Sequence, residues 1–255
     1  MLNSPFSILS PLEQFEIVLY LFFDNILGYN ILFSNTTLFL VITGMLSIAL
    51  YTFSFFEKLL IPTRWQYFAE IIYKVSASIV SENLGKKGER YFPLVFVLFI
   101  ILLISNLIGM IPYTFTVTSH IAFTFGLSLS LFIGINIIGL YQHGFNFLCV
   151  FLPKGVPLPI IPLIVAIEIV SYFIKVFTLA IRLFANITSG HTLLKIIASF
   201  GWSIAHLSGI YSIFQLVPLL VLFILTGLEL GIAVLQAYVF TLLTCIYLND
   251  VLDMH

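Results

Sequence analysis

Residues 91–115 read YFPLVFVLFIILLISNLIGMIPYTF, without a single Asp, Glu, Lys or Arg. A helix that crosses a bilayer needs about 20 apolar residues, because the hydrocarbon core is about 30 Å thick. The uncharged run continues to residue 153, which leaves room for a second crossing at residues 121–141 after a short polar turn at residues 118–120. We therefore predict two transmembrane helices that form an antiparallel pair.

The rest of the chain has the same character. Of its 255 residues, 61% are hydrophobic and only 8% are charged, whereas soluble domains carry about 25% charged residues. The formal net charge is -1 and no long basic block is present, which excludes nucleic acid as a partner. Cys149 and Cys245 lie in apolar runs without Cys or His companions, so both are expected to pack as small hydrophobic residues. The chain is predicted to be an integral membrane protein that holds no metal or cofactor.

Two segments of different character precede the antiparallel pair. Residues 37–56 form an uncharged run that predicts the first span, and an acidic, amphipathic stretch with Glu13, Glu16 and Asp24 comes before it. Residues 57–90 collect six of the ten Lys and Arg residues of the chain, among apolar residues at helical spacing. This pattern is typical of an amphipathic helix that lies in the membrane interface.

Two long apolar stretches, residues 163–208 and 212–248, make up the C-terminal part. As helices they would be about 50 to 65 Å long, roughly twice the thickness of the hydrocarbon core. Such helices must tilt steeply or bend. The predicted fold class is therefore all-α integral membrane, with about five transmembrane helices, one interfacial amphipathic helix and a long, strongly tilted C-terminal helical hairpin, in a single membrane domain over residues 1–255.

The basic residues predict the orientation of the chain. Lys and Arg in short loops stay on the cytoplasmic or matrix side of a membrane, which places residues 57–90 inside. Counting the spans from there puts the N-terminus outside. The last helix then returns so that Asp250 and His255 lie inside.

Charged side chains within the two long helices are unusual, because each is costly at membrane depth and marks a functional site by default. Glu168, Lys175 and Arg182 are spaced seven residues apart, and Asn186 follows four residues later. Seven residues are close to two helical turns, so these side chains share one stripe. His191, nine residues after Arg182, falls about half a turn away and is expected to face a different space.

The last helix repeats this spacing, since Glu229 and Gln236 are also seven residues apart and Asp250 lies near the inner end. Glu229 has no cation nearby on its own helix, which favours a functional role. Asn106 and Asn136, in the middle of their spans, are expected to make interhelical hydrogen bonds.

Arg182 is the strongest candidate for a functional charge. It lies twenty residues after Pro162 and thirteen before Lys195, so its side chain cannot easily reach water by extending along the helix. Two interpretations remain open for Lys175 and Lys195. Each has a functional role, or its long side chain extends to the interface or its ammonium pairs with Glu168 or a lipid phosphate.

Residues 178–194, TLAIRLFANITSGHTLL, closely resemble the signature helix of subunit a of the F-type ATP synthases. The resemblance extends over nearly the whole chain, through SPLEQFEI at 10–17, SNLIGMIPY at 105–113, GLYQHG at 139–144 and LELGIAVLQAYVFTLLTCIYLND at 228–250. It is greatest to the mitochondrial, and particularly the fungal, form. In such forms a short leader can be removed before a Ser-Pro-Leu start, which would make residues 1–9 a leader.

The resemblance implies a proton path of two half-channels that meet a rotating ring of c subunits, each with one essential carboxylate. It implies the mitochondrial inner membrane as the location, with the N-terminus in the intermembrane space and the C-terminus in the matrix. The implied partners are the c ring, the other membrane-sector subunits including the peripheral stalk, the lipid bilayer and protons. The chain has no Gly-rich phosphate-binding loop, so ATP chemistry would belong to partners and the chain alone is not an enzyme.

The same resemblance implies a role for each polar position. Arg182 matches the arginine that faces the ring carboxylate and separates the half-channels. The other positions fall into three groups: the outer entry with His191 and Glu229, the inner exit with Glu168 and Asp250, and the polar neighbours of the arginine, Asn186 and Gln236. The family pattern does not fix a basic residue at Lys175, so no role follows for it. Physically, a guanidinium that is always protonated favours the ionised form of an approaching carboxylate and opposes direct proton passage between the half-channels.

Two other classes of membrane protein remain as alternatives. A secondary ion transporter would also place charges at the midplane, but it usually contains paired repeats with interrupted helices, and no such symmetry is visible. A structural or haem-holding subunit would need paired axial histidines on facing spans. Only His191 and His206 lie near one another in the sequence.

Overall fold

The structure is a computed structural model that describes residues 14–26, 29–55, 62–111, 114–144, 147, 160–205 and 214–252. Within these residues, five helices are long and apolar enough to cross a membrane. They are α1 (Asn35–Phe55), α3 (Phe92–Gly109), α4 (Ile121–His143), α5 (Ile161–Ala205) and α6 (Leu216–Leu252). The predicted all-α membrane architecture with about five spans is confirmed. The proposed leader, Cys149 and the last three residues lie outside the described part of the chain.

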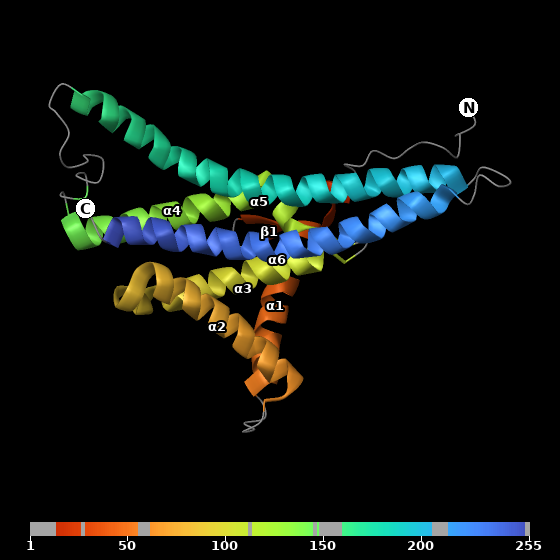
Figure 1. Ribbon diagram of the computed structural model, residues 1–255, viewed down its shortest axis with the longest axis horizontal. Coiled ribbons are helices and arrows are strands. Elements are labelled where there is room, and N and C mark those ends of the chain that lie inside the picture. The colour runs from red at the N-terminus through yellow and green to blue at the C-terminus, as the bar shows by residue number, and fades with distance from the viewer. Residues whose placement is uncertain are drawn as a thin grey trace.

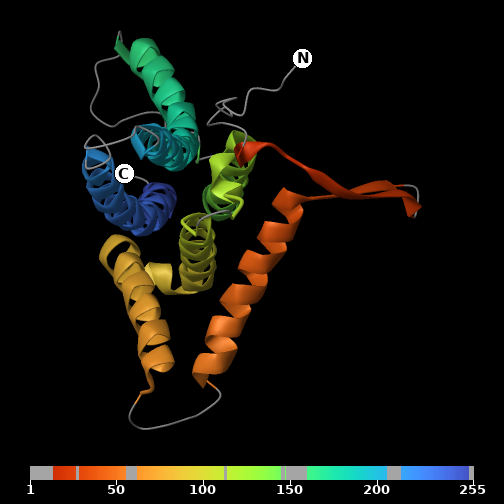
Figure 2. The ribbon, with the colours of Figure 1, turned by 90° about the vertical axis from the view of Figure 1, so that its right-hand side faces the viewer.

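Two short strands at the N-terminal end were not predicted. β1 (Leu19–Ile26) pairs antiparallel with β2 (Tyr29–Ser34), and the resulting hairpin projects from the helices (Figure 2). Both strands are rich in aromatic and β-branched residues, which favour extended backbone. The side-chain amide of Asn35, the first residue of α1, donates to the carbonyl of Glu16 over 3.0 Å. This bond ties the start of the first span to the segment before β1.

The basic segment contains α2 (Arg64–Leu84), followed by the 3-10 helix η2 (Gly85–Tyr91). The hydroxyl of Thr63 caps α2 by accepting from the backbone N–H of Gln66, as N-cap threonines do. Ala69, Ile72 and Ile79 are among the residues of its buried face, whereas Trp65 is 68% exposed. The predicted amphipathic helix is therefore present, and its buried face packs on α3 and α6.

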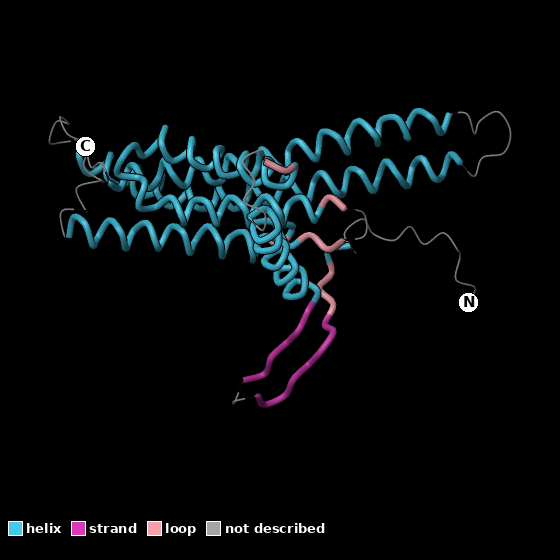
Figure 3. The backbone as a smooth tube through the Cα atoms, turned by 90° about the horizontal axis from the view of Figure 1, so that it is seen from below, coloured by secondary structure: helices cyan, strands magenta, loops and turns pink. Residues whose placement is uncertain are grey.

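The two C-terminal helices lie antiparallel and side by side over much of their length (Figures 1 and 3). With 45 and 37 residues, they are about 67 and 55 Å long, which is well beyond the thickness of the hydrocarbon core. α5 bends, and its N-terminal part diverges from α6 (Figures 1 and 2). Pro162 and Pro218 both lie in the first turn of their helix, where proline is tolerated. The predicted long hairpin is confirmed, and its length requires tilt or bending in a bilayer.

The helix over residues 91–115 was predicted too long at its C-terminal end, since α3 ends at Gly109. Pro112 lies three residues beyond, and a helix usually ends before a proline because of the clash with the preceding residue. The chain then turns through η3 (Val117–Ser119) into α4.

α3 is the central helix of the fold. Its residues Leu98 and Leu102 pack in one apolar cluster with Leu183 of α5 and Phe240 of α6. Ala233 and Ala237 of α6 are fully buried, and small residues of this kind allow membrane helices to approach closely.

A second apolar cluster joins α2 to the C-terminal end of α6. Ile79 and Leu84 of α2 contribute to it together with Leu248 and Val251 of α6. The basic segment therefore lies at the same end of the hairpin as Asp250.

Candidate functional site

Polar contacts between described residues of α5 and α6 follow one another along the hairpin. His191 Nε2 lies 3.8 Å from Glu229 Oε1. Asn186 Nδ2 donates to Gln236 Oε1 over 3.0 Å. The remaining contact links Lys175 Nζ to Asp250 Oδ2 at 3.5 Å. The order matches antiparallel helices, since each step back along α5 goes with a step forward along α6, and Arg182 lies between the second and third contacts.

The contact between His191 and Glu229 is buried. The side chain of Glu229 is 5% exposed and that of His191 is 17% exposed. Neither carboxylate oxygen of Glu229, nor Nε2 of His191, has a hydrogen-bond partner among the described residues. A buried carboxylate without hydrogen bonds is costly unless water or a proton reaches it. The arrangement is therefore suited to proton exchange between the two groups, because imidazole titrates near neutral pH.

Gly190 makes room for the Glu229 side chain. A Cβ at position 190 would lie 2.5 Å from Oε1 and 3.0 Å from Cδ of Glu229, so any larger residue would displace the carboxylate. Gly190 follows Asn186 by four residues and continues the polar stripe of α5. His191, the next residue, contacts the same carboxylate, which agrees with the grouping of His191 with Glu229 that the family resemblance implies. Its orientation away from the Arg182 stripe stays a prediction.

Arg182 lies on the stripe four residues before Asn186, about one helical turn away. Its side chain is partly exposed, and within the described residues it has neither a hydrogen bond nor an ion pair. A cation of this kind at membrane depth requires an anion. Gln236, which accepts from Asn186, is buried and fixes the polar surface next to the guanidinium.

The inner end of the stripe contains an ion pair that the sequence did not predict. Asp250 contacts Lys175, and the ammonium also lies 5.2 Å from the ring centroid of Tyr247. Within the described residues, the partner of Lys175 is therefore Asp250 of α6 and not Glu168 of its own helix. The N-terminal part of α5 bends away from α6 (Figures 1 and 2).

The connection between α3 and α4 contains polar groups that the sequence did not single out. Thr118 is fully buried and Thr116 is 4% exposed, yet neither hydroxyl has a hydrogen-bond partner among the described residues, and the same is true of His120 Nε2. Buried groups of this kind are normally satisfied by ordered water. Burial also lowers the pKa of His120, which favours its neutral form.

This connection lies beside the His191 end of the hairpin. Thr188 Oγ1 donates to the carbonyl of Ser119 over 3.4 Å, and Thr188 precedes His191 by three residues, which places both on adjacent turns of α5. Unsatisfied polar atoms therefore gather from the α3–α4 connection to the carboxylate of Glu229. The sequence signal was the run TFTVTSH at residues 114–120, which is equally typical of an ordinary turn at the end of a span.

The two asparagines in the middle of their spans make the predicted interhelical bonds. Asn106 Nδ2 donates to the carbonyl of Ala233 over 3.1 Å, which joins α3 to α6. The hydroxyl of Tyr172 donates to Asn136 Oδ1 over 2.9 Å, which joins α5 to α4. Both predictions are confirmed.

The sequence model of a family described as the ATP synthase A chain matches residues 35–249. "ATP synthase subunit a" of Chondrus crispus is 61% identical over 254 residues, covering 100% of both chains. The protein of the same name from Marchantia polymorpha is 48% identical over 250 residues, covering 96% of this chain and 99% of the relative. That of Brassica napus is 46% identical over 255 residues, covering 96% and 97%. None of these three organisms is a fungus, so the closer likeness to fungal forms stays a prediction.

Proposed function

The chain belongs to the ATP synthase A chain family, and from that premise we propose that it translocates protons across the mitochondrial inner membrane within the membrane sector of the synthase. The observation that carries the proposal is the order of contacts along the α5–α6 hairpin. His191 and Glu229 meet on one side of Arg182, and Lys175 and Asp250 meet on the other. The path is therefore divided into two half-channels at the level of Arg182.

The outer half-channel starts at the α3–α4 connection. Water at the unsatisfied groups of Thr116, Thr118 and His120 would lead towards Thr188 and then to His191 and Glu229. A proton taken up by Glu229 then moves towards the level of Asn186 and Gln236, where a carboxylate of a partner subunit can accept it. One proton that crosses 100 mV releases about 2.3 kcal/mol, which sets the scale of work for each transfer.

Arg182 keeps the two half-channels apart. Its guanidinium stays protonated, so it stabilises an ionised carboxylate that passes it and causes that group to release its proton on the inner side. The same charge repels a proton that would pass directly from one half-channel to the other. His191 lies about 13 Å along α5 on one side of Arg182, and Glu168 lies about 21 Å along it on the other.

The inner half-channel leads past Glu168 and Asp250 to the matrix. The basic segment supports this orientation, since Arg90 lines the same groove as Leu252, two residues after Asp250. Basic residues in short loops stay on the matrix side. The N-terminus would then lie in the intermembrane space and the C-terminus in the matrix.

A ring of c subunits is the partner that this site needs. Ile174, Phe177 and Ile181 of α5, within about two turns of Arg182, are each about half exposed. An apolar surface with one unpaired cation fits helices that are apolar except for one carboxylate. The peripheral stalk and the other membrane-sector subunits would hold this chain against the ring.

Sided labelling tests the proposal. In a chain with Cys149 and Cys245 replaced by Ala, Glu229→Cys or His191→Cys should react with silver ion applied from the intermembrane space. Glu168→Cys or Asp250→Cys should react with silver ion applied from the matrix. The readout is the silver sensitivity of residual ATP-driven proton pumping or direct labelling of the thiol in mitoplasts and in inverted vesicles.

A buried apolar position supplies the control for this experiment. Leu102 is fully buried in the core between α3 and α6, so Leu102→Cys should react from neither side. Labelling of positions 168 and 229 from the same side would refute the division into two half-channels.

A further inference from the structure

We infer that Asp250 neutralises Lys175 rather than carrying protons itself, which leaves Glu168 as the carboxylate that accepts protons on the inner side. The inference rests on the proposed proton path and assigns a task to a lysine that family resemblance leaves without one. It starts from the ion pair between Lys175 Nζ and Asp250 Oδ2 at 3.5 Å.

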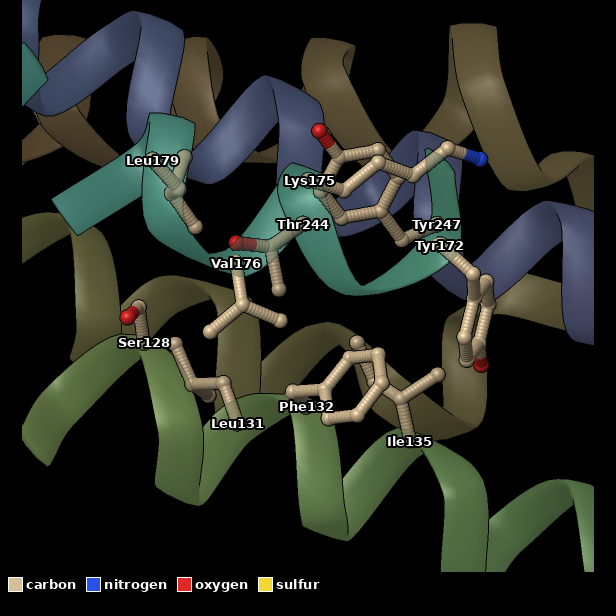
Figure 4. Close-up of a pocket in the computed structure, with 10 residues that line it drawn as sticks. All are labelled: Ser128, Leu131, Phe132, Ile135, Tyr172, Lys175, Val176, Leu179, Thr244 and Tyr247. Atoms are coloured by element: carbon tan, nitrogen blue, oxygen red, sulfur yellow. The ribbon is translucent and has the colours of Figure 1, made fainter. Parts of the chain in front are cut away.

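Aromatic rings and an interhelical hydrogen bond hold Lys175 in place. Its ammonium lies 5.2 Å from the ring centroid of Tyr247 and 5.9 Å from that of Tyr172. The stem of Lys175 runs beside Tyr247 at the edge of a small cavity between α4, α5 and α6 (Figure 4). Tyr172 is fixed in turn by its bond to Asn136 of α4. The lysine is therefore positioned between two helices and is not a side chain that extends freely to the membrane surface.

The position of Lys175 makes a counter-charge necessary. It lies on the Arg182 stripe, about 10 Å along α5 towards the inner side. An uncompensated second cation there would repel any proton that leaves the ring carboxylate for the matrix. It would also compete with Arg182 for that carboxylate. With Asp250 ionised, the pair is neutral as a unit and Arg182 remains the dominant charge on the stripe.

Proton binding by Asp250 would remove this neutrality. Each protonation event would leave Lys175 unpaired within the membrane, which is costly. Glu168 has no such constraint, because it is partly exposed and, in the part of the chain that the structure describes, forms no hydrogen bond or ion pair. It lies seven residues before Lys175, on the same stripe and nearer the inner end of α5.

A double-mutant cycle tests the inference in membranes that contain the assembled synthase. Asp250→Asn alone leaves the cation unpaired and should lower proton-driven ATP synthesis about tenfold, within the coupling range of contacting pairs. The double variant Lys175→Gln/Asp250→Asn should recover synthesis to within about twofold of the parent, because neither charge remains. If the double variant stays as defective as Asp250→Asn, then Asp250 carries protons and the inference is overturned.

Glu168 supplies the matched control. Removing Lys175 should not rescue Glu168→Gln, since these two groups share no contact, whereas equal rescue of Glu168→Gln would overturn the assignment. If Asp250→Asn has no effect at all, the pair has no task and the inference also fails.

Assembly is followed on native gels for each variant. If Asp250→Asn fails to assemble, the charge exchange Lys175→Asp/Asp250→Lys provides a second test, because it restores an ion pair with the two charges exchanged. The proposed function itself is judged separately by Arg182→Ala. If Arg182→Ala still pumps protons, the proposed proton path is refuted. The Lys175–Asp250 double-mutant cycle would then report only the structural coupling between the two charges.

Discussion

The two ends of the polar stripe on the α5–α6 hairpin hold charges in opposite ways. At the outer end, Glu229 is buried beside His191, and neither group has a hydrogen-bond partner among the described residues. At the inner end, Lys175 and Asp250 are 32% and 49% exposed and form an ion pair. Among the described residues, the outer groups leave buried polar atoms without a partner, whereas the inner groups satisfy each other as opposite charges. In the proposed path, the outer end passes protons and the inner pair sets the local charge.

The packing around the two ends differs as well. The outer carboxylate sits against the backbone at Gly190, with the unsatisfied groups of the α3–α4 connection nearby. The inner ammonium lies among aromatic rings. Buried polar atoms without a protein partner are normally satisfied by ordered water. Among the described residues, His191 and Glu229 at the outer end carry such atoms, whereas Lys175 and Asp250 at the inner end contact each other. The following predictions test this difference.

Arg182→Ala should have the largest effect, because it removes the charge that separates the two ends. We expect ATP-coupled proton pumping to be lost while the complex still assembles. Arg182→Lys should not restore it, since a compact ammonium lacks the spread charge and donor geometry of a guanidinium. Proton pumping in membrane vesicles is the measurement. Ser199→Ala on the same helix is the control, because among the described residues the hydroxyl of Ser199 donates only to the carbonyl of Ile196, within α5. Normal pumping by Arg182→Ala would defeat the mechanism.

Gly190→Ala should disturb the outer end alone. The added Cβ would lie 2.5 Å from Oε1 of Glu229, so the carboxylate must move away from His191. We expect ATP synthesis to fall about tenfold, which corresponds to about 1.4 kcal/mol in the rate-limiting barrier. Gly231→Ala is the matched control, because an added Cβ there meets nothing within 4 Å. Equal activity of the two variants would show that Glu229 does not depend on this close approach.

Thr118→Val should have the smallest effect and distinguish a dry turn from a hydrated one. The substitution keeps the shape of a fully buried side chain and removes a hydroxyl without a partner among the described residues. In a dry site the change is neutral or stabilising. If water reaches the connection, proton uptake should slow by about two- to fivefold with unchanged assembly, since a single water-mediated contact is worth about as much as one hydrogen bond. Thr226→Val is the control, because Thr226 is partly exposed and, among the described residues, its hydroxyl bonds only within α6.

Much of this architecture was predictable from local sequence. Uncharged runs predicted the spans, the basic run predicted the amphipathic α2, and seven-residue spacing predicted which side chains share a stripe on each long helix. These features depend on neighbours within a few turns, since helical periodicity and the membrane thickness act on each segment separately. Asn106 and Asn136 belong to the same class, because an amide in the middle of a span must find a partner.

Only the tertiary structure decided which residues meet across the hairpin. Family resemblance grouped His191 with Glu229, and the structure gives their contact, but nothing in the sequence paired Lys175 with Asp250. These contacts depend on the register of α5 against α6, which is set by packing of small and apolar residues such as Ala237 and Leu183 against α3. The bend of α5 then carries its N-terminal part away from α6 (Figure 1). No periodicity within one helix contains that information, because register and bend are properties of several helices packed together.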